Sequence, residues 1–201
     1  MIAVIDYGAG NLFSVCNALN YLNIAHCVTK DAAEIDRADA VILPGVGAFP
    51  AAMASLEATG LVGTIRENAA RKPLLGICLG MQMLFERSDE NGECSGLGLI
   101  PGEVHLLPSK RVIIPHMGWN ELVITQESPL LGGIEMPLYT YFVHSYQAFC
   151  DDSNIIAYCD YDGKVPALVT DGKFVFGAQF HPEKSGEKGL MMLRNFERTA
   201  I

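Results

Sequence analysis

The sequence is short of basic residues and lacks the cysteine spacings of common metal and redox sites. Its 201 residues include 14 Lys and Arg against 23 Asp and Glu, which gives a net charge of −9. A chain of this charge repels nucleic-acid phosphate, so we expect no nucleic-acid partner. No two of the six cysteines are spaced as Cys-x-x-Cys, which argues against zinc-ribbon and thioredoxin-type sites. We expect neither a metal ion nor an organic cofactor.

The sequence also lacks an apolar run long enough to span a lipid bilayer. Residues 1–6 are typical of a β-strand and not of a basic or cleavable targeting leader. We therefore expect no membrane partner and a reducing, cytoplasmic setting in which most cysteines are small buried hydrophobic residues. Half of the residues are hydrophobic and 18% are charged, which is typical of one folded domain over residues 1–201.

Apolar runs alternate with helical patterns in the first half of the chain. Strands are expected over residues 2–5, 25–28, 40–43 and 73–77. Helices are expected over residues 12–22, over 49–70 with an interruption near 59–60, and over 79–87. This alternation predicts an α/β fold of flavodoxin-like type, with a mostly parallel central sheet and helices on both faces.

The second half of the chain has mainly strand patterns separated by turn signals. Strands are expected over residues 104–107, 112–114, 121–125, 139–144, 155–158, 167–170 and 174–180. Asp171 and Gly172 predict a hairpin turn between the last two strands, and a final helix is expected over residues 188–199. The C-terminal half therefore adds an antiparallel extension to the sheet.

Cys78 stands where an expected strand meets an expected helix, with Gly76 and Gly80 two residues before and after it. Small residues at these positions let the chain turn sharply, because a Cβ atom would crowd the turn. Such an elbow displays the side chain at the end of the strand, and the helix N-terminus beneath it favours the thiolate. An isolated cysteine is more often a buried structural thiol, but the flanking glycines make Cys78 the candidate nucleophile.

His181 and Glu183 complete a candidate triad. His181 is the candidate base and acid, because an ordinary histidine titrates near pH ~6.5. Glu183 lies two residues further on and shares a face with His181 in an extended segment, where it can hold the imidazole tautomer. An oxyanion needs two N–H donors, which we assign to Leu79 and Val46. These groups predict a thiol hydrolase of a small amide.

Three motifs, at residues 44–47, 76–82 and 179–183, together resemble the class I, triad-type glutamine amidotransferases. Segments 6–11, 115–120, 141–146 and 183–185 also match, so the resemblance spans nearly the whole chain in one order. It implies a glutamine amidotransferase type 1 domain that hydrolyses glutamine to glutamate and ammonia.

Within this family, the chain is similar to the subunits that serve histidine biosynthesis. This resemblance implies a heterodimer with a cyclase subunit of the (β/α)8 barrel type. The cyclase would use ammonia to make imidazole glycerol phosphate and an aminoimidazole carboxamide ribonucleotide. The resemblance further implies glutamine contacts by Gly47, Gln82, Glu90, Ser145 and Tyr146. It implies cyclase contacts by Asn11, Trp119 and Lys184.

Two other functions stay open at this point: a glutaminase of another pathway, and a silent regulatory subunit with the same fold. The complete triad argues against silence. We expect weak glutaminase activity in the isolated chain, with the peptide between Gly45 and Val46 turned away until the partner docks. His144 is a second candidate base, for which a structural or gating role is favoured. His116 is assigned to packing or to an interface.

Overall fold

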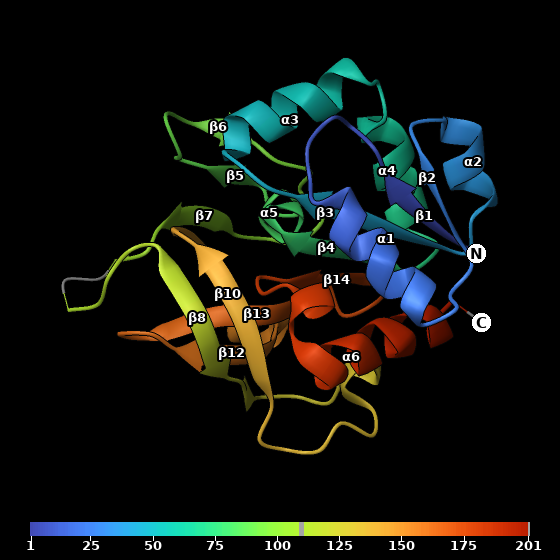
Figure 1. Ribbon diagram of the computed structural model, residues 1–201. Coiled ribbons are helices and arrows are strands. Elements are labelled where there is room, and N and C mark those ends of the chain that lie inside the picture. The colour runs from blue at the N-terminus through green and yellow to red at the C-terminus, as the bar shows by residue number, and fades with distance from the viewer. Residues whose placement is uncertain (109–110, 201) are drawn as a thin grey trace.

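The computed structural model describes residues 1–108 and 111–200 and is built on one eight-stranded sheet (Figure 1). The strands, in order across the sheet, are β2 (His26–Thr29), β1 (Ile2–Ile5), β3 (Ala40–Gly45), β4 (Leu74–Cys78), β14 (Val175–Ala178), β13 (Lys164–Thr170), β12 (Ile155–Asp160) and β9 (Val123–Ile124). The strands from β2 to β14 are parallel, whereas β13, β12 and β9 pair as antiparallel strands. This is the flavodoxin-like order with an antiparallel extension, so the predicted fold class is confirmed.

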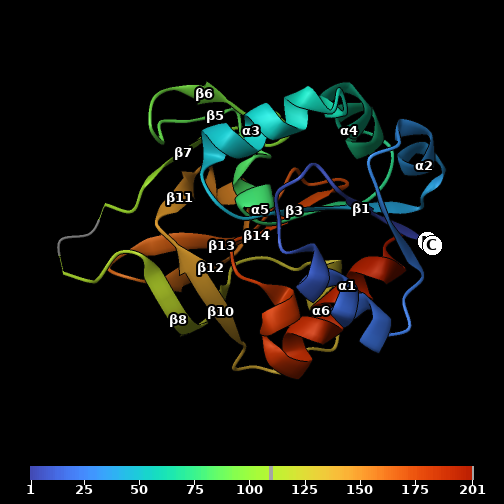
Figure 2. The same cartoon turned by 45° about the horizontal axis from the view of Figure 1, so that its top comes forward.

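Helices cover both faces of the parallel part of the sheet (Figures 1 and 2). On one face lie α1 (Leu12–Tyr21) and α6 (Gly186–Arg198). On the other lie α2 (Ala32–Arg37), α3 (Phe49–Ala58) and α4 (Val62–Ala69). Successive side chains of a strand point to opposite faces, so Ile42 joins the core under α1 and α6 while Val41 and Leu43 join the other. Strands buried on both faces explain the continuous apolar runs.

Two smaller sheets stand beside the carboxyl end of the main sheet. One contains β11 (Tyr146–Phe149), β7 (Glu103–Leu106), β5 (Arg87–Ser88) and β6 (Cys94–Ser95). The other pairs β8 (His116–Glu121) with β10 (Tyr139–His144) in antiparallel register. The remaining elements are the short helix α5 (Leu79–Gln82) and the 3-10 turns η1 (Pro129–Leu131), η2 (Asp152–Asn154) and η3 (Pro182–Lys184).

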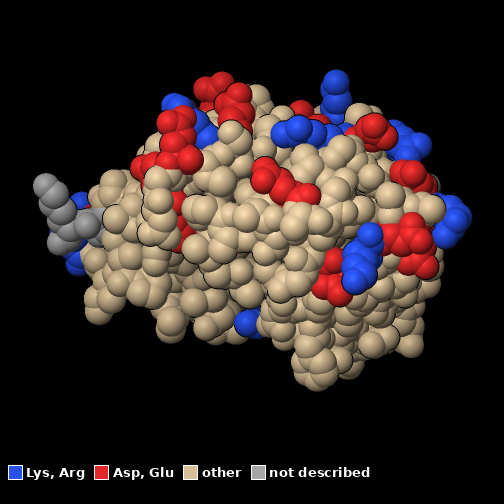
Figure 3. Space-filling model, turned by 90° about the horizontal axis from the view of Figure 1, so that it is seen from above, with Lys and Arg blue, Asp and Glu red and all other residues tan. Residues whose placement is uncertain are grey.

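Charged side chains are unevenly spread over the surface. Figure 3, which looks down on the molecule, shows them gathered over the upper part and the right side of the view. The lower edge of that view shows few of them. Among the described residues, no helix combines the length and apolar character needed to cross a membrane.

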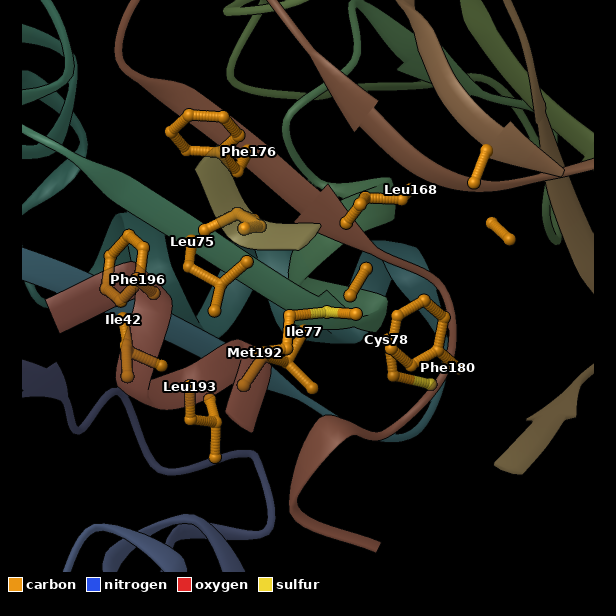
Figure 4. Packing of buried hydrophobic residues seen from close by; sticks show 14 of the residues in the cluster. Ile42, Leu75, Ile77, Cys78, Leu168, Phe176, Phe180, Met192, Leu193 and Phe196 are labelled. Carbon is orange, nitrogen blue, oxygen red and sulfur yellow. The ribbon is translucent and has the colours of Figure 1, made fainter. Parts of the chain in front are cut away.

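The core beneath α6 extends to the end of β4. Figure 4 shows Ile77 and Cys78 of β4 close to Phe180, with Met192 of α6 on the same side. Phe180 and Met192 are fully excluded from solvent. Cys78, the last residue of β4, therefore lies on a strand that close packing holds in place.

Several expected elements are confirmed with small shifts at their ends. The helix expected over residues 49–70 is interrupted at 59–61, and Asp171 and Gly172 do turn the chain between β13 and β14. The strand expected over 174–180 is shorter, because β14 ends at Ala178. The final helix begins two residues earlier than expected, at Gly186.

Two expected elements are wrong, and the structure shows the physical reason for each. The strand over 112–114 is absent: the backbone bends there, Ile113 is 81% exposed, and pairing with β10 begins only at His116. The helix over 79–87 ends at Gln82. The carbonyls of Met83 and Phe85 accept hydrogen bonds from the N–H groups of residues 97 and 98, which replaces the helical pattern. The helix α2 and the strands β5, β6, β8 and β11 were not expected from the sequence.

Candidate functional site

Cys78 sits in a strained elbow between β4 and α5. Its φ of 55° and ψ of −112° lie outside the helical and extended regions that side-chain-bearing residues normally adopt. A Cβ atom on Gly76 would lie 2.6 Å from the carbonyl oxygen of Gly80, and one on Gly80 would overlap the carbonyl oxygen of Leu43. The elbow therefore requires glycine at both positions because β3, β4 and α5 approach so closely.

His181 and Glu183 form a buried pair next to this elbow. The Nδ1 atom of His181 lies 2.8 Å from Oε1 of Glu183, and their side chains are 3% and 0% exposed. The N–H of His181 donates to the carbonyl oxygen of Tyr141 at 3.0 Å, which ties the turn after β14 to β10. With Nδ1 bound to the carboxylate, the imidazole is held in one orientation.

The electrostatic surroundings favour the protonated form of His181. Burial alone lowers its pKa, but hydrogen bonds and charge interactions with Cys78 and Glu183 outweigh burial and raise the pKa to about 9. The imidazolium is therefore stable at neutral pH beside the sulfur atom. A protonated histidine between a thiol and a carboxylate is equipped to donate a proton to a leaving group.

A cavity of about 330 Å³ opens beside the pair and the elbow. Its walls come from the carboxyl end of the main sheet and from β10 and β11. The residues that line it are Val46, Gly47, Cys78, Leu79, Gln82, Glu90, Pro115, Val143, His144, Ser145, Tyr146 and His181. The structure thus places every sequence-predicted catalytic, oxyanion and substrate residue on this cavity except Glu183, which lies behind it in contact with His181.

A larger hollow of about 770 Å³ runs along residues 124–136 at the far end of β9. Glu127 is the one ionisable side chain among the residues that line it. It holds no histidine or cysteine, so the smaller cavity is the candidate for chemistry.

The expected oxyanion donors lie at the ends of adjacent strands. Gly45, the last residue of β3, pairs with Cys78 of β4, so Val46 and Leu79 follow side by side. The Tyr7 hydroxyl donates to the carbonyl oxygen of Pro44 at 2.9 Å and holds the chain just before this turn. Burial raises the pKa of Tyr7, so the phenol remains a donor at neutral pH. Tyr7 was not expected from the sequence to support the site.

The amide of Gln82 is fixed by two neighbours. Its Nε2 atom donates to the carbonyl oxygen of Tyr146 at 2.9 Å and to Oε1 of Gln179 at 3.0 Å. Both amide hydrogens are therefore used, and the amide oxygen is the atom left for a ligand. Gln179, which accepts this hydrogen bond, is fully buried. The only sequence signal for this role was its place in a motif beside an apolar strand.

Glu90 and Ser185 have structural partners in addition to their place near the site. The Glu90 carboxylate accepts from the backbone N–H of Phe49 at 2.8 Å, at the start of α3, and also borders the cavity. The Ser185 hydroxyl donates to the carbonyl oxygen of His181 at 2.6 Å and accepts from the N–H of Tyr141 at 3.0 Å. Ser185 thus secures the turn that carries the histidine, a role that its sequence position alone did not reveal.

The other five cysteines stay away from this chemistry. Burial raises the pKa of Cys150 to about 11 and that of Cys159 to about 12, and it also raises the pKa values of Cys16, Cys27 and Cys94. The expectation that most are buried is wrong, since only Cys159 of these five is buried and the others are half-buried. Among the described residues, no group of three or more His, Cys, Asp or Glu could hold a metal ion.

The residues expected at a partner interface are accessible. Trp119 is 54% exposed and Lys184 is exposed, while Asn11 is half-buried and caps α1 through a hydrogen bond to the N–H of Ser14. Trp119 pairs with Tyr141 across β8 and β10, with ring centroids 6.1 Å apart. These strands face the reader in Figure 1, as α1 does.

A comparison with known protein families agrees with the geometry of the site. The profile of the family "Glutamine amidotransferase class-I" matches residues 3–199. The chain belongs to the class I glutamine amidotransferases. The elbow cysteine, the buried His-Glu pair and the cavity between them are thus features of a glutamine amidotransferase fold.

Two curated relatives and one solved structure illustrate the similarity. "Imidazole glycerol phosphate synthase subunit HisH" of Bacillus cereus is 56% identical over 198 residues, 98% of this chain and 94% of that protein. The protein of the same name from Bacillus anthracis is 54% identical over 200 residues, with the same shares covered. A crystal structure titled glutamine amidotransferase has a TM-score of 0.78 and 19% identity, and covers 100% of this chain and 99% of its own. At that identity the structure supports the amidotransferase fold alone.

Proposed function

We propose that this amidotransferase is the glutaminase subunit of an imidazole glycerol phosphate synthase, with one amidotransferase domain over residues 1–201. The observation that carries the proposal is that Cys78, His181, Gln82 and Tyr146 line one cavity, with His181 hydrogen-bonded to Glu183 behind it. Relatives of that name, identical at more than half of the positions over 98% of the chain, support the same assignment.

The first half of the reaction forms a thioester. The Cys78 sulfur attacks the side-chain amide carbon of glutamine, and the carbonyl oxygen takes up negative charge. The N–H groups of Leu79 and Val46 stabilise that oxyanion. His181 gives its proton to the amide nitrogen, the carbon–nitrogen bond breaks, and ammonia leaves.

The second half returns the enzyme to its starting state. Neutral His181 removes a proton from water, and the resulting hydroxide attacks the thioester carbon. The carbon–sulfur bond breaks, glutamate is released, and Cys78 is left as a thiolate beside the imidazolium. Glu183 accepts a hydrogen bond from Nδ1 of His181 throughout and stabilises its charge.

Glutamine is held by groups on three sides of the cavity. The free amide oxygen of Gln82 accepts from the substrate's ammonium or amide groups, and Glu90 pairs with the ammonium. Ser145 and Tyr146 contribute backbone atoms, and Gly47 leaves room for the substrate to approach. These assignments use the positions of the residues around the cavity.

The partner is a cyclase subunit of the (β/α)8 barrel type that receives ammonia. We place its docking surface over α1 and β8, which both face the reader in Figure 1. On these elements Phe13, Met117 and Trp119 are 77%, 61% and 54% exposed. Asn11 and Lys184 supply polar contacts at this surface. Large exposed aromatic side chains are typical anchors of protein interfaces.

We place the protein in a reducing, cytoplasmic setting. Cys78 must be reduced in order to attack, and all six cysteines are free thiols.

The test is an assay of glutamate release by the purified chain with and without the cyclase and its nucleotide ligand. We expect weak release by the chain alone and strong stimulation by the loaded partner. High release without any partner, or no stimulation by the cyclase, would contradict the proposal.

A further inference from the structure

His144 borders the glutamine cavity and is not part of the Cys-His-Glu arrangement. Its Nδ1 atom lies 2.8 Å from the carbonyl oxygen of Tyr146, and its Nε2 atom lies 3.0 Å from Nδ1 of His116. A carbonyl oxygen can only accept, so the proton of His144 is on Nδ1. Its Nε2 atom is therefore an acceptor, and the N–H that it accepts from belongs to His116.

His116 is fixed on all sides. Its ring is fully buried between the rings of Tyr161 and Phe142, with centroids at 3.8 and 4.7 Å. Its Nε2 atom lies 2.8 Å from Oδ1 of Asn120. A neutral His116 that donates from Nδ1 must accept at Nε2, where an amide oxygen cannot donate. We therefore interchange the oxygen and nitrogen of the Asn120 amide, so that its NH2 group faces the ring.

Both histidines are neutral at physiological pH. Burial lowers the pKa of His144 to about 3, although its hydrogen bond to Tyr146 acts in the opposite direction. Burial also lowers the pKa of His116. The hydrogen bonds therefore run in one direction, from the Asn120 amide through His116 and His144 to the carbonyl oxygen of Tyr146.

That carbonyl oxygen is a shared anchor for the substrate cavity. It accepts from His144 at 2.8 Å and from Nε2 of Gln82 at 2.9 Å. Its two lone pairs are thus occupied, and the peptide of Tyr146 cannot rotate without breaking both bonds. The orientation of the Gln82 amide depends on this carbonyl, because an amide turned by 180° would bring two oxygen atoms together.

We propose that His144, held by His116, is a positioning residue that fixes the Tyr146 carbonyl and the Gln82 amide for glutamine binding. It does not exchange a proton with the substrate or with Cys78. This inference rests on the proposed glutaminase function.

The experiment compares His144→Leu and His144→Asn with the natural chain, each in complex with the cyclase and its nucleotide ligand. Leucine removes the donor, whereas the asparagine NH2 group can occupy the place of Nδ1. We expect His144→Leu to raise the KM for glutamine about ten- to hundredfold with kcat changed less than about threefold. His144→Asn should restore most of the affinity, and neither variant should move the pH profile of kcat/KM.

A second readout separates loss of positioning from loss of folding. Iodoacetamide should alkylate Cys78 at the same rate in the natural chain and in His144→Leu, because the small reagent needs no glutamine contacts. A glutamine-shaped electrophile, the diazo ketone analogue of glutamine, should label His144→Leu about tenfold or more slowly. If His144→Leu is alkylated more slowly than the natural chain by both reagents, or at the natural rate by both, the inference is overturned.

Two kinetic results for His144→Leu would also overturn the inference. One is a hundredfold loss of kcat with KM unchanged, which would indicate that His144 is a second base. The other is a KM equal to that of the natural chain. The proposed function fails in a different way, since the natural complex would then release no glutamate at all.

Discussion

The Nδ1 atom of His181 lies 2.8 Å from Oε1 of Glu183, in a place where neither side chain is open to solvent. The pKa of His181 is about 9, because Cys78 and Glu183 together outweigh the effect of burial. In the proposed mechanism protonated His181 gives its proton to the departing ammonia, and this protonated form is lost as the pH rises through about 9. We expect kcat/KM for glutamine to fall above pH 9, and this is measured as a pH profile of the complex.

The matched variant is Glu183→Gln. It removes a charge that raises the pKa of His181, so the alkaline limb should move to lower pH, and kcat should also fall. A limb that stays in place in Glu183→Gln would show that the carboxylate does not control this histidine.

The elbow glycines give a prediction on stability. A Cβ atom on Gly80 would overlap the carbonyl oxygen of Leu43, so Gly80→Ala must push apart α5 and β3. We expect the free energy of unfolding to fall by about 3 kcal/mol or more, measured by urea denaturation. Gly63→Ala is the control, because Gly63 lies within α4 with open space around it, and alanine should stabilise by about 0.5–1 kcal/mol. Equal stabilities of the two variants would contradict the close packing at the elbow.

The Tyr7 hydroxyl donates a 2.9 Å hydrogen bond to the carbonyl oxygen of Pro44, just before the turn that carries Val46, the proposed oxyanion donor. We expect Tyr7→Phe to cost about 1 kcal/mol of stability and to lower kcat about three- to tenfold, less than the loss of a whole oxyanion donor. Tyr21→Phe is the matched control, since Tyr21 is 76% exposed on α1. If both variants keep full kcat and stability, Tyr7 does not position the turn.

Trp119 tests the docking surface. We expect Trp119→Ala to weaken binding of the cyclase about 30-fold or more, measured by titration calorimetry, because an exposed tryptophan anchors many interfaces. At saturating cyclase the glutaminase rate should return toward that of the natural chain. Val28→Ala is the control. Val28 is 46% exposed on β2, an edge strand of the main sheet, whereas Trp119 lies on β8 of a different sheet. Unchanged affinity in Trp119→Ala would move the interface elsewhere.

The sequence predicted the parallel sheet because its strands are buried on both faces and therefore appear as continuous apolar runs. It also predicted that Cys78 and His181 lie at one edge of the sheet, because a cysteine between two glycines and a histidine after a strand both mark strand ends. The expected glutamine contacts came from the family resemblance instead. The carboxyl ends of β4 and β14 are adjacent in the sheet, so these marks converge.

What the sequence did not predict depends on contacts between distant segments. β8 contains Gly118 and Asn120, which have low strand propensity, and its pairing with β10 decides its conformation. The apolar residues 112–114 have strand propensity, but the backbone bends there and forms no strand. The supporting roles of Tyr7, Gln179 and Ser185 rest on hydrogen bonds to atoms far along the chain, which no local pattern reveals.

The central claim is that Cys78 is the nucleophile of a partner-dependent glutaminase. The most direct measurement is glutamate release by the Cys78→Ala chain in complex with the cyclase and its nucleotide ligand. We predict no release above the uncatalysed background, while the same complex supplied with ammonium salt still forms the cyclase products, which shows that it is assembled. Continued glutamate release by Cys78→Ala would contradict the account.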